Sequence, residues 1–153
     1  MANYDFLKQL ANYMFSRKGL YGLFSNPGFG KTTLMIHLIH EFSGFGEKCL
    51  LFSLELSKQQ VLDRMNRFKL SPDGLMVLDS PLCNFETIAK KTQMEKPQCV
   101  FIDYLQLVDG NKCDLIKDLK EITEQFSVLS FLQEHYPENP AIMICLIAPN
   151  YMI

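Results

Sequence analysis

Short apolar runs alternate along this chain with longer segments in which apolar residues recur at the spacing of an α-helix. The apolar runs predict strands over about 20–25, 48–53, 75–78, 98–103 and 141–147. The helical spacing predicts helices over about 3–16, 31–42, 57–68, 85–95 and 114–135. Because nearly continuous apolar strands alternate with helices, we expect an α/β fold in three layers, with a mainly parallel central sheet. The carboxyl ends of its strands should lie along one edge, where ligands bind in such folds.

The predicted helix over 3–16 is amphipathic, and its apolar face needs a partner. The residues at helical spacing are Phe6, Leu7, Leu10, Tyr13 and Met14. This face could pack on the domain's own sheet or on a neighbouring subunit, and the pattern favours neither.

The predicted helix over 114–135 is the longest in the chain. Its apolar stripe consists of Leu115, Leu119, Ile122, Phe126, Leu129 and Leu132. Pro137 and Pro140 then bracket the turn that leads into the last predicted strand.

Composition sets limits on the class of protein. The length of 153 residues fits one domain over 1–153 with a substantial hydrophobic core. A hydrophobic content of 48% with 21% charged residues argues against a disordered chain. The formal net charge is −2, so the chain has no general basic character. Binding to nucleic acid would therefore need a local patch of positive charge or an assembly of several chains.

The cysteines, at positions 49, 83, 99, 113 and 145, form no CxxC pair. This spacing argues against a zinc site or a disulfide framework, and free thiols indicate a reducing compartment. Asp5 and Lys8 interrupt the first apolar stretch, which argues against a signal peptide. No apolar run approaches the roughly 20 residues that span a membrane. We therefore expect a cytoplasmic protein with no membrane partner.

The segment between the first predicted strand and the helix after it is the most informative in the chain. It reads Ser25-Asn26-Pro27-Gly28-Phe29-Gly30-Lys31-Thr32-Thr33. Its glycines let backbone N–H groups curl around an anion, and the helix directs its positive dipole end at the same anion. Lys31 adds a charge for the β- and γ-phosphates, and the Thr32 hydroxyl can ligate Mg²⁺. A chance Gly-rich turn is the alternative, but the flanking strand and helix favour a phosphate-binding P-loop made of these residues.

Acidic residues end two of the other predicted strands. Asp103 follows the apolar run 99–102, as in a Walker B strand, and its carboxylate can contact Thr32 or the metal region. The alternative is an Asp that only caps a turn. Glu55 ends the second strand, and its carboxylate could polarise an attacking water if that strand lies near the P-loop. Otherwise it is a solvated residue before a helix.

Further segments follow in a characteristic order. Residues 52–56 read Phe-Ser-Leu-Glu-Leu, 59–65 read Gln-Gln-Val-Leu-Asp-Arg-Met and 102–107 read Ile-Asp-Tyr-Leu-Gln-Leu. With a P-loop that begins with the small residue Ser25 instead of Gly, these segments resemble the ATPase domain of DnaB-type replicative helicases. The likeness covers about residues 20–147, and the Asp-Tyr-Leu-Gln-Leu run is its most specific part.

The resemblance implies a RecA-like P-loop NTPase fold and a role in DNA replication, with ATP and Mg²⁺ as cofactors. Lys31 and Glu55 would be the catalytic residues, with Glu55 activating the attacking water. Thr32 and Asp103 would hold the metal. The partners that the resemblance implies are single-stranded DNA, further copies of this chain, and helicase or loader subunits.

Departures from the family's pattern bear on turnover. The family carries a polar residue, commonly Gln, near the end of the strand that we align with 141–147, and Leu146 occupies that place. A Leu side chain cannot hydrogen-bond to a γ-phosphate. We also expect a carboxyl-terminal truncation that removes the family's arginine finger and second DNA-facing loop, and no amino-terminal primase-interacting domain. An arginine finger in trans contributes ~10³–10⁵ in rate, so hydrolysis should be slow and unwinding by this chain alone is not expected.

These features leave different classes of function open. Intact Lys31, Thr32, Asp103 and Glu55 favour a Mg²⁺-dependent ATPase. Leu146 and the expected carboxyl-terminal truncation favour a degenerate nucleotide-binding module that assembles with a helicase or loader and turns over little. A truncated product of a phage or mobile-element gene, without an independent role, is the third hypothesis.

Overall fold

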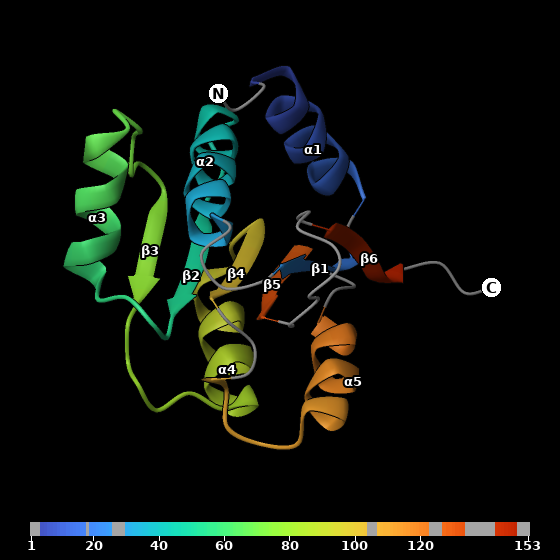
Figure 1. Ribbon diagram of the computed structural model, residues 1–153. Helices are drawn as coiled ribbons and strands as arrows, with labels where there is room; N and C mark the ends of the chain where they lie inside the picture. The colour runs from blue at the N-terminus through green and yellow to red at the C-terminus, as the bar shows by residue number, and fades with distance from the viewer. Residues whose placement is uncertain are drawn as a thin grey trace.

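A six-stranded sheet forms the middle of the molecule, and helices cover both of its faces (Figure 1). This computed structural model describes residues 4–17, 19–25, 30–103, 107–122, 127–133 and 143–149. The strands are β1 (Gly19–Ser25), β2 (Cys49–Ser53), β3 (Leu75–Leu78), β4 (Cys99–Asp103), β5 (Ser127–Gln133) and β6 (Met143–Pro149). The helices are α1 (Tyr4–Ser16), α2 (Lys31–Gly44), α3 (Lys58–Arg67), α4 (Phe85–Glu95) and α5 (Lys112–Ile122). Within these ranges, no helix is long and apolar enough to cross a bilayer.

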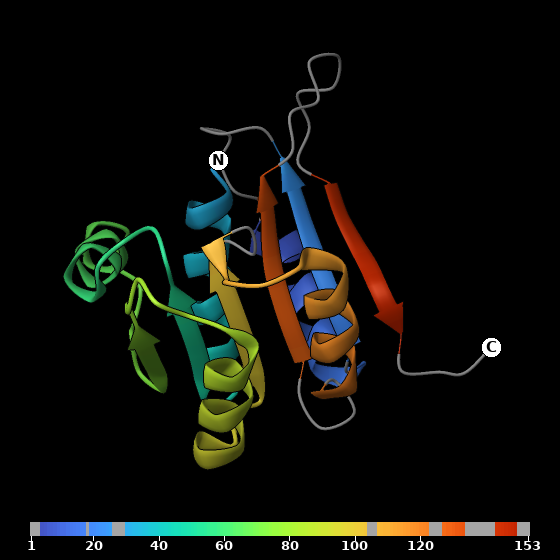
Figure 2. The same cartoon turned by 90° about the horizontal axis from the view of Figure 1, so that it is seen from below.

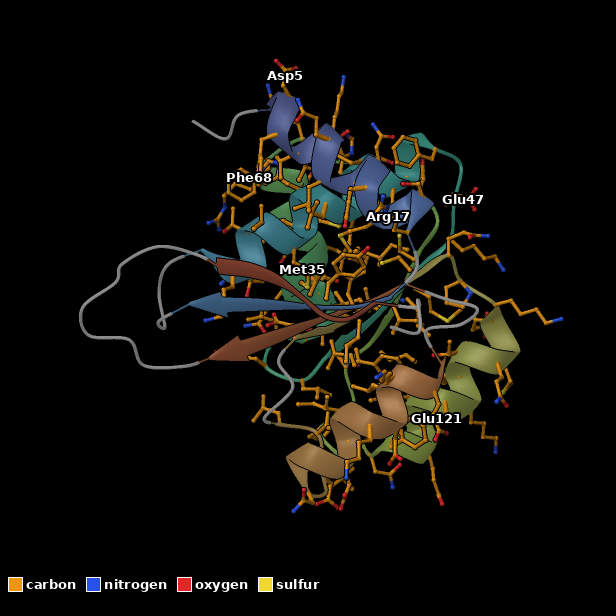
Figure 3. All side chains as sticks on the ribbon, turned by 90° about the vertical axis from the view of Figure 1, so that its right-hand side faces the viewer. Asp5, Arg17, Met35, Glu47, Phe68 and Glu121 are labelled. Carbon is orange, nitrogen blue, oxygen red and sulfur yellow. The ribbon has the colours of Figure 1, made fainter. Side chains whose placement is uncertain are left out.

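The hydrophobic core is divided by the sheet into two layers, because alternate residues of a strand face opposite sides. One cluster packs α1, α2 and α3 against one face and includes Met14, Met35, Leu51, Val61 and Phe101. The other packs α4 and α5 against the opposite face and includes Leu50, Phe52, Ile88, Ile102 and Leu119. Figure 3 shows the sheet edge-on between the two helical layers, with Met35 between α2 and the sheet. The predicted three-layer α/β architecture is confirmed.

The carboxyl-terminal third differs from the prediction. The helix expected over 114–135 is wrong in its second half, because α5 ends at Ile122 and residues 127–133 form β5. The strand β5 pairs in parallel with both β1 and β4. Its apolar residues suit a helical stripe and a buried strand equally well, and hydrogen bonds from two neighbouring strands decide between them.

The last strand, β6, is placed close to its predicted range but runs in the opposite direction to its neighbour. It pairs antiparallel with β1 at the edge of the sheet, as its reversed arrow shows in Figure 2. The sheet order is β3-β2-β4-β5-β1-β6. The sheet is therefore mainly parallel, as expected, but the expectation that every strand ends at one edge is wrong for β6.

The helix α1 packs on its own domain. Leu7, Ala11 and Met14 are buried in the same cluster as residues of α2, and α1 lies beside α2 in Figure 1. Of the two partners left open by the sequence, the domain's own core takes Leu7 and Met14, while Phe6 and Tyr13 of the predicted face are exposed.

Side-chain caps fix the starts of two helices where the sequence predicted them. Ser57 and Gln60 form a capping box at α3, in which the Gln60 N–H donates to the Ser57 hydroxyl and the Ser57 N–H donates to the Gln60 side chain. Asn84 accepts the N–H of Thr87 at the start of α4. Each cap satisfies a backbone group that the helix leaves without a partner, which defines where the helix begins.

Gly74 occupies a position that other residues fit poorly. Its φ is 73°, and an added Cβ would lie 2.8 Å from the carbonyl oxygen of Glu47. We expect Gly74→Ala to lower the free energy of unfolding by about 1–3 kcal/mol, measured by chemical denaturation. Gly44→Ala is the control, because nothing lies within 4 Å of the Cβ it would add. An equal loss in both variants would contradict this account of Gly74.

Candidate nucleotide-binding site

The predicted site residues that the structure describes lie at the edge of the sheet where β1, β2, β4 and β5 end. Ser53 at the end of β2 pairs with Asp103 at the end of β4. Ser25 at the end of β1 pairs with Gln133 at the end of β5, and the heads of these two strands lie together in Figure 2. Because ligands of parallel α/β sheets bind at this edge, it is the candidate site.

The amino terminus of α2 has a backbone conformation that suits anion binding. Gly30 caps the helix in the left-handed conformation, with a φ of 86°, and its carbonyl accepts the N–H of Leu34 at 2.9 Å. Gly30 has no side chain that could cap the first turn, and the positive dipole end of this helix points to the edge of the sheet, where it favours a phosphate. Residues 26–29 lie outside the described residues, and Ser25 is described by its backbone alone. The nucleotide contacts expected of Ser25, Asn26, Pro27, Gly28 and Phe29 therefore remain predictions.

Thr32 and Asp103 meet directly. The Thr32 hydroxyl donates a hydrogen bond to Oδ2 of Asp103 at 3.0 Å, which joins the first turn of α2 to the end of β4. The Asp103 side chain is only 1% exposed. Burial raises the pKa of Asp103 to about 6, against the hydrogen bond from Thr32, which lowers it. The two predicted metal-binding residues are thus in contact, and the carboxyl of Asp103 has little access to solvent.

Lys31 and Glu55 complete one electrostatic cluster with Asp103. Lys31 is 5% exposed, and burial lowers its pKa, while the charges of Asp103 and Glu55 act in the opposite direction. Glu55 also raises the pKa of Asp103. The strand that carries Glu55 is not a neighbour of β1, because β4 and β5 lie between them. The charge of Glu55 nevertheless acts on Lys31 at the start of α2, since β2 ends beside the end of β4.

The partly buried Thr33 follows in the first turn of α2, which completes the described part of the P-loop segment. The run Tyr104-Leu105-Gln106, the most specific part of the sequence resemblance, lies outside the described residues.

A polar residue ends the strand beside β1 at this edge, at a position other than the one inferred from the sequence. Leu146 lies within β6 and pairs with Tyr21 in the middle of β1, away from the carboxyl edge. The strand that ends at this edge beside β1 is β5, and its last residue is Gln133. Sequence reasoning missed Gln133 because residues 114–135 were interpreted as one helix. A boundary near Ser127 would have revealed it.

The available donors fit Mg²⁺ bound together with a nucleotide. Among the described residues, no three His, Cys, Asp or Glu side chains gather into a metal site. The Thr32 hydroxyl and the Asp103 carboxylate are oxygen donors that suit Mg²⁺, which in nucleotide sites takes its other ligands from phosphate and water. A cation beside Asp103 would also stabilise its ionised form, which burial disfavours.

Solved structures with the same fold include ATPase domains. The chain superposes on one solved ATPase domain with a TM-score of 0.64 at 21% identity, over 76% of this chain and 57% of that one. A DnaB-like replicative helicase, solved to show its interactions with primase, gives a TM-score of 0.64 at 21% identity, over 76% of this chain and 40% of that one. The flagellar accessory protein FlaH from Methanocaldococcus jannaschii gives a TM-score of 0.65 at 13% identity, over 76% of this chain and 61% of FlaH. The chain therefore has the three-layer RecA-like fold that the sequence predicted.

Sequence relatives of this RecA-like chain include DNA repair proteins. It is 24% identical over 128 residues to the DNA repair protein RadA of Campylobacter jejuni, covering 76% of this chain and 28% of RadA. It is 29% identical over 92 residues to RadA of Chlamydia trachomatis, covering 60% of this chain and 20% of that protein. The chain thus spans less than a third of the length of these relatives. No family model matches it.

Proposed function

We propose that this protein binds ATP with Mg²⁺ and hydrolyses it as a RecA-like domain in DNA metabolism, most specifically in DNA replication. The observation that carries the proposal is the 3.0 Å hydrogen bond between Thr32 and Asp103, because it joins the helix after the P-loop to a Walker B carboxylate. Similarity to RadA and to a DnaB-like replicative helicase supports the link to DNA. The free, buried thiols of Cys49, Cys83 and Cys99 fit a reducing compartment, the cytoplasm.

In this proposal, the segment 25–33 holds the triphosphate. The N–H groups at the start of α2 donate to phosphate oxygens, and Lys31 contributes a positive charge to the β- and γ-phosphates. Because Lys31 is buried, its attraction to phosphate is screened less than it would be at the surface. Thr32 and Asp103 would hold Mg²⁺, which when bound neutralises charge on the phosphates.

Glu55 is the proposed base. Its carboxylate lies at the same edge of the sheet and accepts a proton from the water whose oxygen attacks the γ-phosphorus. The bond from that phosphorus to the bridging oxygen breaks, and ADP and phosphate leave. Lys31 and the backbone N–H groups stabilise the charge on the transferred group. In this proposal, Gln133, the last residue of β5, supplies the polar group that Leu146 cannot.

Single-stranded DNA and assembly with further copies, or with helicase or loader subunits, belong to the same proposal. They are supported by the similarity to a DnaB-like replicative helicase. The alternative function is a nucleotide-binding module with little turnover. Leu146 does not support this alternative, because Leu146 lies away from the candidate site.

The proposal is tested by measuring ATP binding and steady-state hydrolysis with Mg²⁺, with and without single-stranded DNA. We expect Lys31→Ala to weaken ATP binding about 10- to 100-fold, because it removes a charged hydrogen-bond donor. Lys117→Ala is the matched control, since Lys117 is exposed on α5. ATP binding without measurable hydrolysis in the unaltered protein would favour the module. No binding, or equal binding in both variants, would contradict the proposed site.

A further inference from the structure

The turn that carries Glu55 is closed by a buried hydroxyl. The side chain of Ser53, the last residue of β2, is 1% exposed, and its Oγ donates a hydrogen bond to the carbonyl oxygen of Leu56 at 2.6 Å. This bond spans Leu54 and Glu55, so it links the two ends of the segment that presents the carboxylate. A partly buried hydrogen bond of this kind limits the conformations open to the turn.

Further hydrogen bonds fix both flanks of the same turn. On one side, the Leu54 N–H donates to the carbonyl oxygen of Asp103 at 2.9 Å. On the other, the Ser57 capping box begins α3, and the Lys58 N–H donates to Oδ2 of Asp79 at 2.7 Å. The turn is therefore attached to β4 at its start and to α3 and the loop after β3 at its end.

Ser53 also sets the position of the turn relative to Asp103. The two residues pair directly across β2 and β4. Ser53 therefore donates its hydrogen bond from the position at which β2 pairs with the end of the Walker B strand. Glu55 itself is exposed, and the backbone of the turn fixes the point from which its side chain extends.

We propose that Ser53 is a positioning residue that holds Glu55 in the orientation required to activate the attacking water. This inference rests on the proposed ATP hydrolysis. Ser53 makes its hydrogen bond to the backbone of the turn and acts through Glu55. Because small displacements of a catalytic group cost up to about 100-fold in rate, losing this bond should affect turnover far more than nucleotide binding.

The test compares Ser53→Ala, Glu55→Gln and the double variant in steady-state ATP hydrolysis. We expect Ser53→Ala to lower kcat about 10- to 100-fold, with KM and the ATP dissociation constant within about threefold. In the Glu55→Gln background, Ser53→Ala should cause no further loss, because the group that it orients is already inactive. Ser53→Thr keeps the hydroxyl and should recover most of the turnover.

Thr92→Val is the matched control. Thr92 is 1% exposed and donates a hydrogen bond of 2.7 Å to the carbonyl of Ile88 within α4, in the opposite helical layer. The substitution removes a buried hydroxyl bond of similar length, and we expect unaltered kcat with a comparable decrease in melting temperature. If the unaltered protein hydrolyses ATP and Ser53→Ala does so equally well, or if the two losses multiply in the double variant, the role of Ser53 is wrong. If the unaltered protein hydrolyses no ATP, the proposed function fails, and the positioning role fails with it.

Discussion

Glu55→Gln should lower the rate of ATP hydrolysis by about 10²- to 10⁴-fold, the usual contribution of a general base. ATP binding should change little, because Glu55 lies at the end of β2 and the phosphate-binding residues lie between β1 and α2. The amide keeps the size of the side chain but cannot take the proton of the attacking water. Single-turnover hydrolysis and equilibrium ATP binding, measured on the same protein, separate the two effects.

Glu86→Gln is the matched control for this prediction. Glu86 is an exposed residue in the first turn of α4, so its replacement should leave hydrolysis unchanged. Hydrolysis by Glu55→Gln at the rate of the unaltered protein would show that another group activates the water. Loss of ATP binding in Glu55→Gln would show that the carboxylate supports the nucleotide site itself.

Asp103→Asn should make the nucleotide-free protein more stable at neutral pH, by up to about 3 kcal/mol. Asp103 is 1% exposed, and burial raises its pKa to about 6. The folded protein therefore holds an ionised carboxylate at neutral pH in a place that disfavours the charge. Asn has nearly the same shape, and its side-chain oxygen can accept the hydrogen bond that Thr32 donates.

The pH range of this gain follows from the direction of the pKa shift. Below about pH 4, the Asp103 carboxyl is protonated in both the folded and the unfolded chain, so the variant should gain nothing. Between about pH 4 and the pKa of about 6 in the folded protein, the Asp103 carboxyl is ionised in the unfolded chain and protonated in the folded one. The free energy of unfolding of the unaltered protein falls over this range as the pH rises, and the advantage of Asp103→Asn grows to a plateau above it.

Denaturation curves for both proteins across this range, without nucleotide, measure the difference. Asp73→Asn, at an exposed position in the turn before β3, should show no such dependence. ATP with Mg²⁺ should then stabilise the unaltered protein more than Asp103→Asn, because the variant has lost the negative charge that faces the metal. A gain that is the same at pH 4 and pH 7 would contradict the buried-charge explanation.

Most of the fold up to Asp103 could be predicted from local patterns. Ser57 and Asn84 are caps whose chemistry acts within a few residues, so the starts of α3 and α4 were predictable. The P-loop is a prediction of the same local kind, because glycines, Lys31 and Thr32 must be close in sequence to act on one phosphate. Contacts between residues close in the sequence can therefore be predicted from the sequence alone.

The carboxyl-terminal third could not be predicted in the same way. The apolar residues of 127–133 fit a helix and a strand, and only pairing with β1 and β4 selects the strand. The direction of β6 likewise depends on its pairing with β1. Because of these two pairings, Gln133 and not Leu146 lies at the end of a strand at the candidate site.

The sequence by itself determined the three-layer α/β fold, because apolar spacing and helix caps operate over short distances. It also predicted a phosphate-binding segment and the residue types of the candidate site. Only the tertiary structure decided that Thr32 donates to Asp103, that Glu55 shares an electrostatic environment with Lys31, and that Ser53 closes the turn of Glu55. The reason is that parallel strands distant in the chain become neighbours through the sheet, and the register between them fixes which side chains meet at its edge.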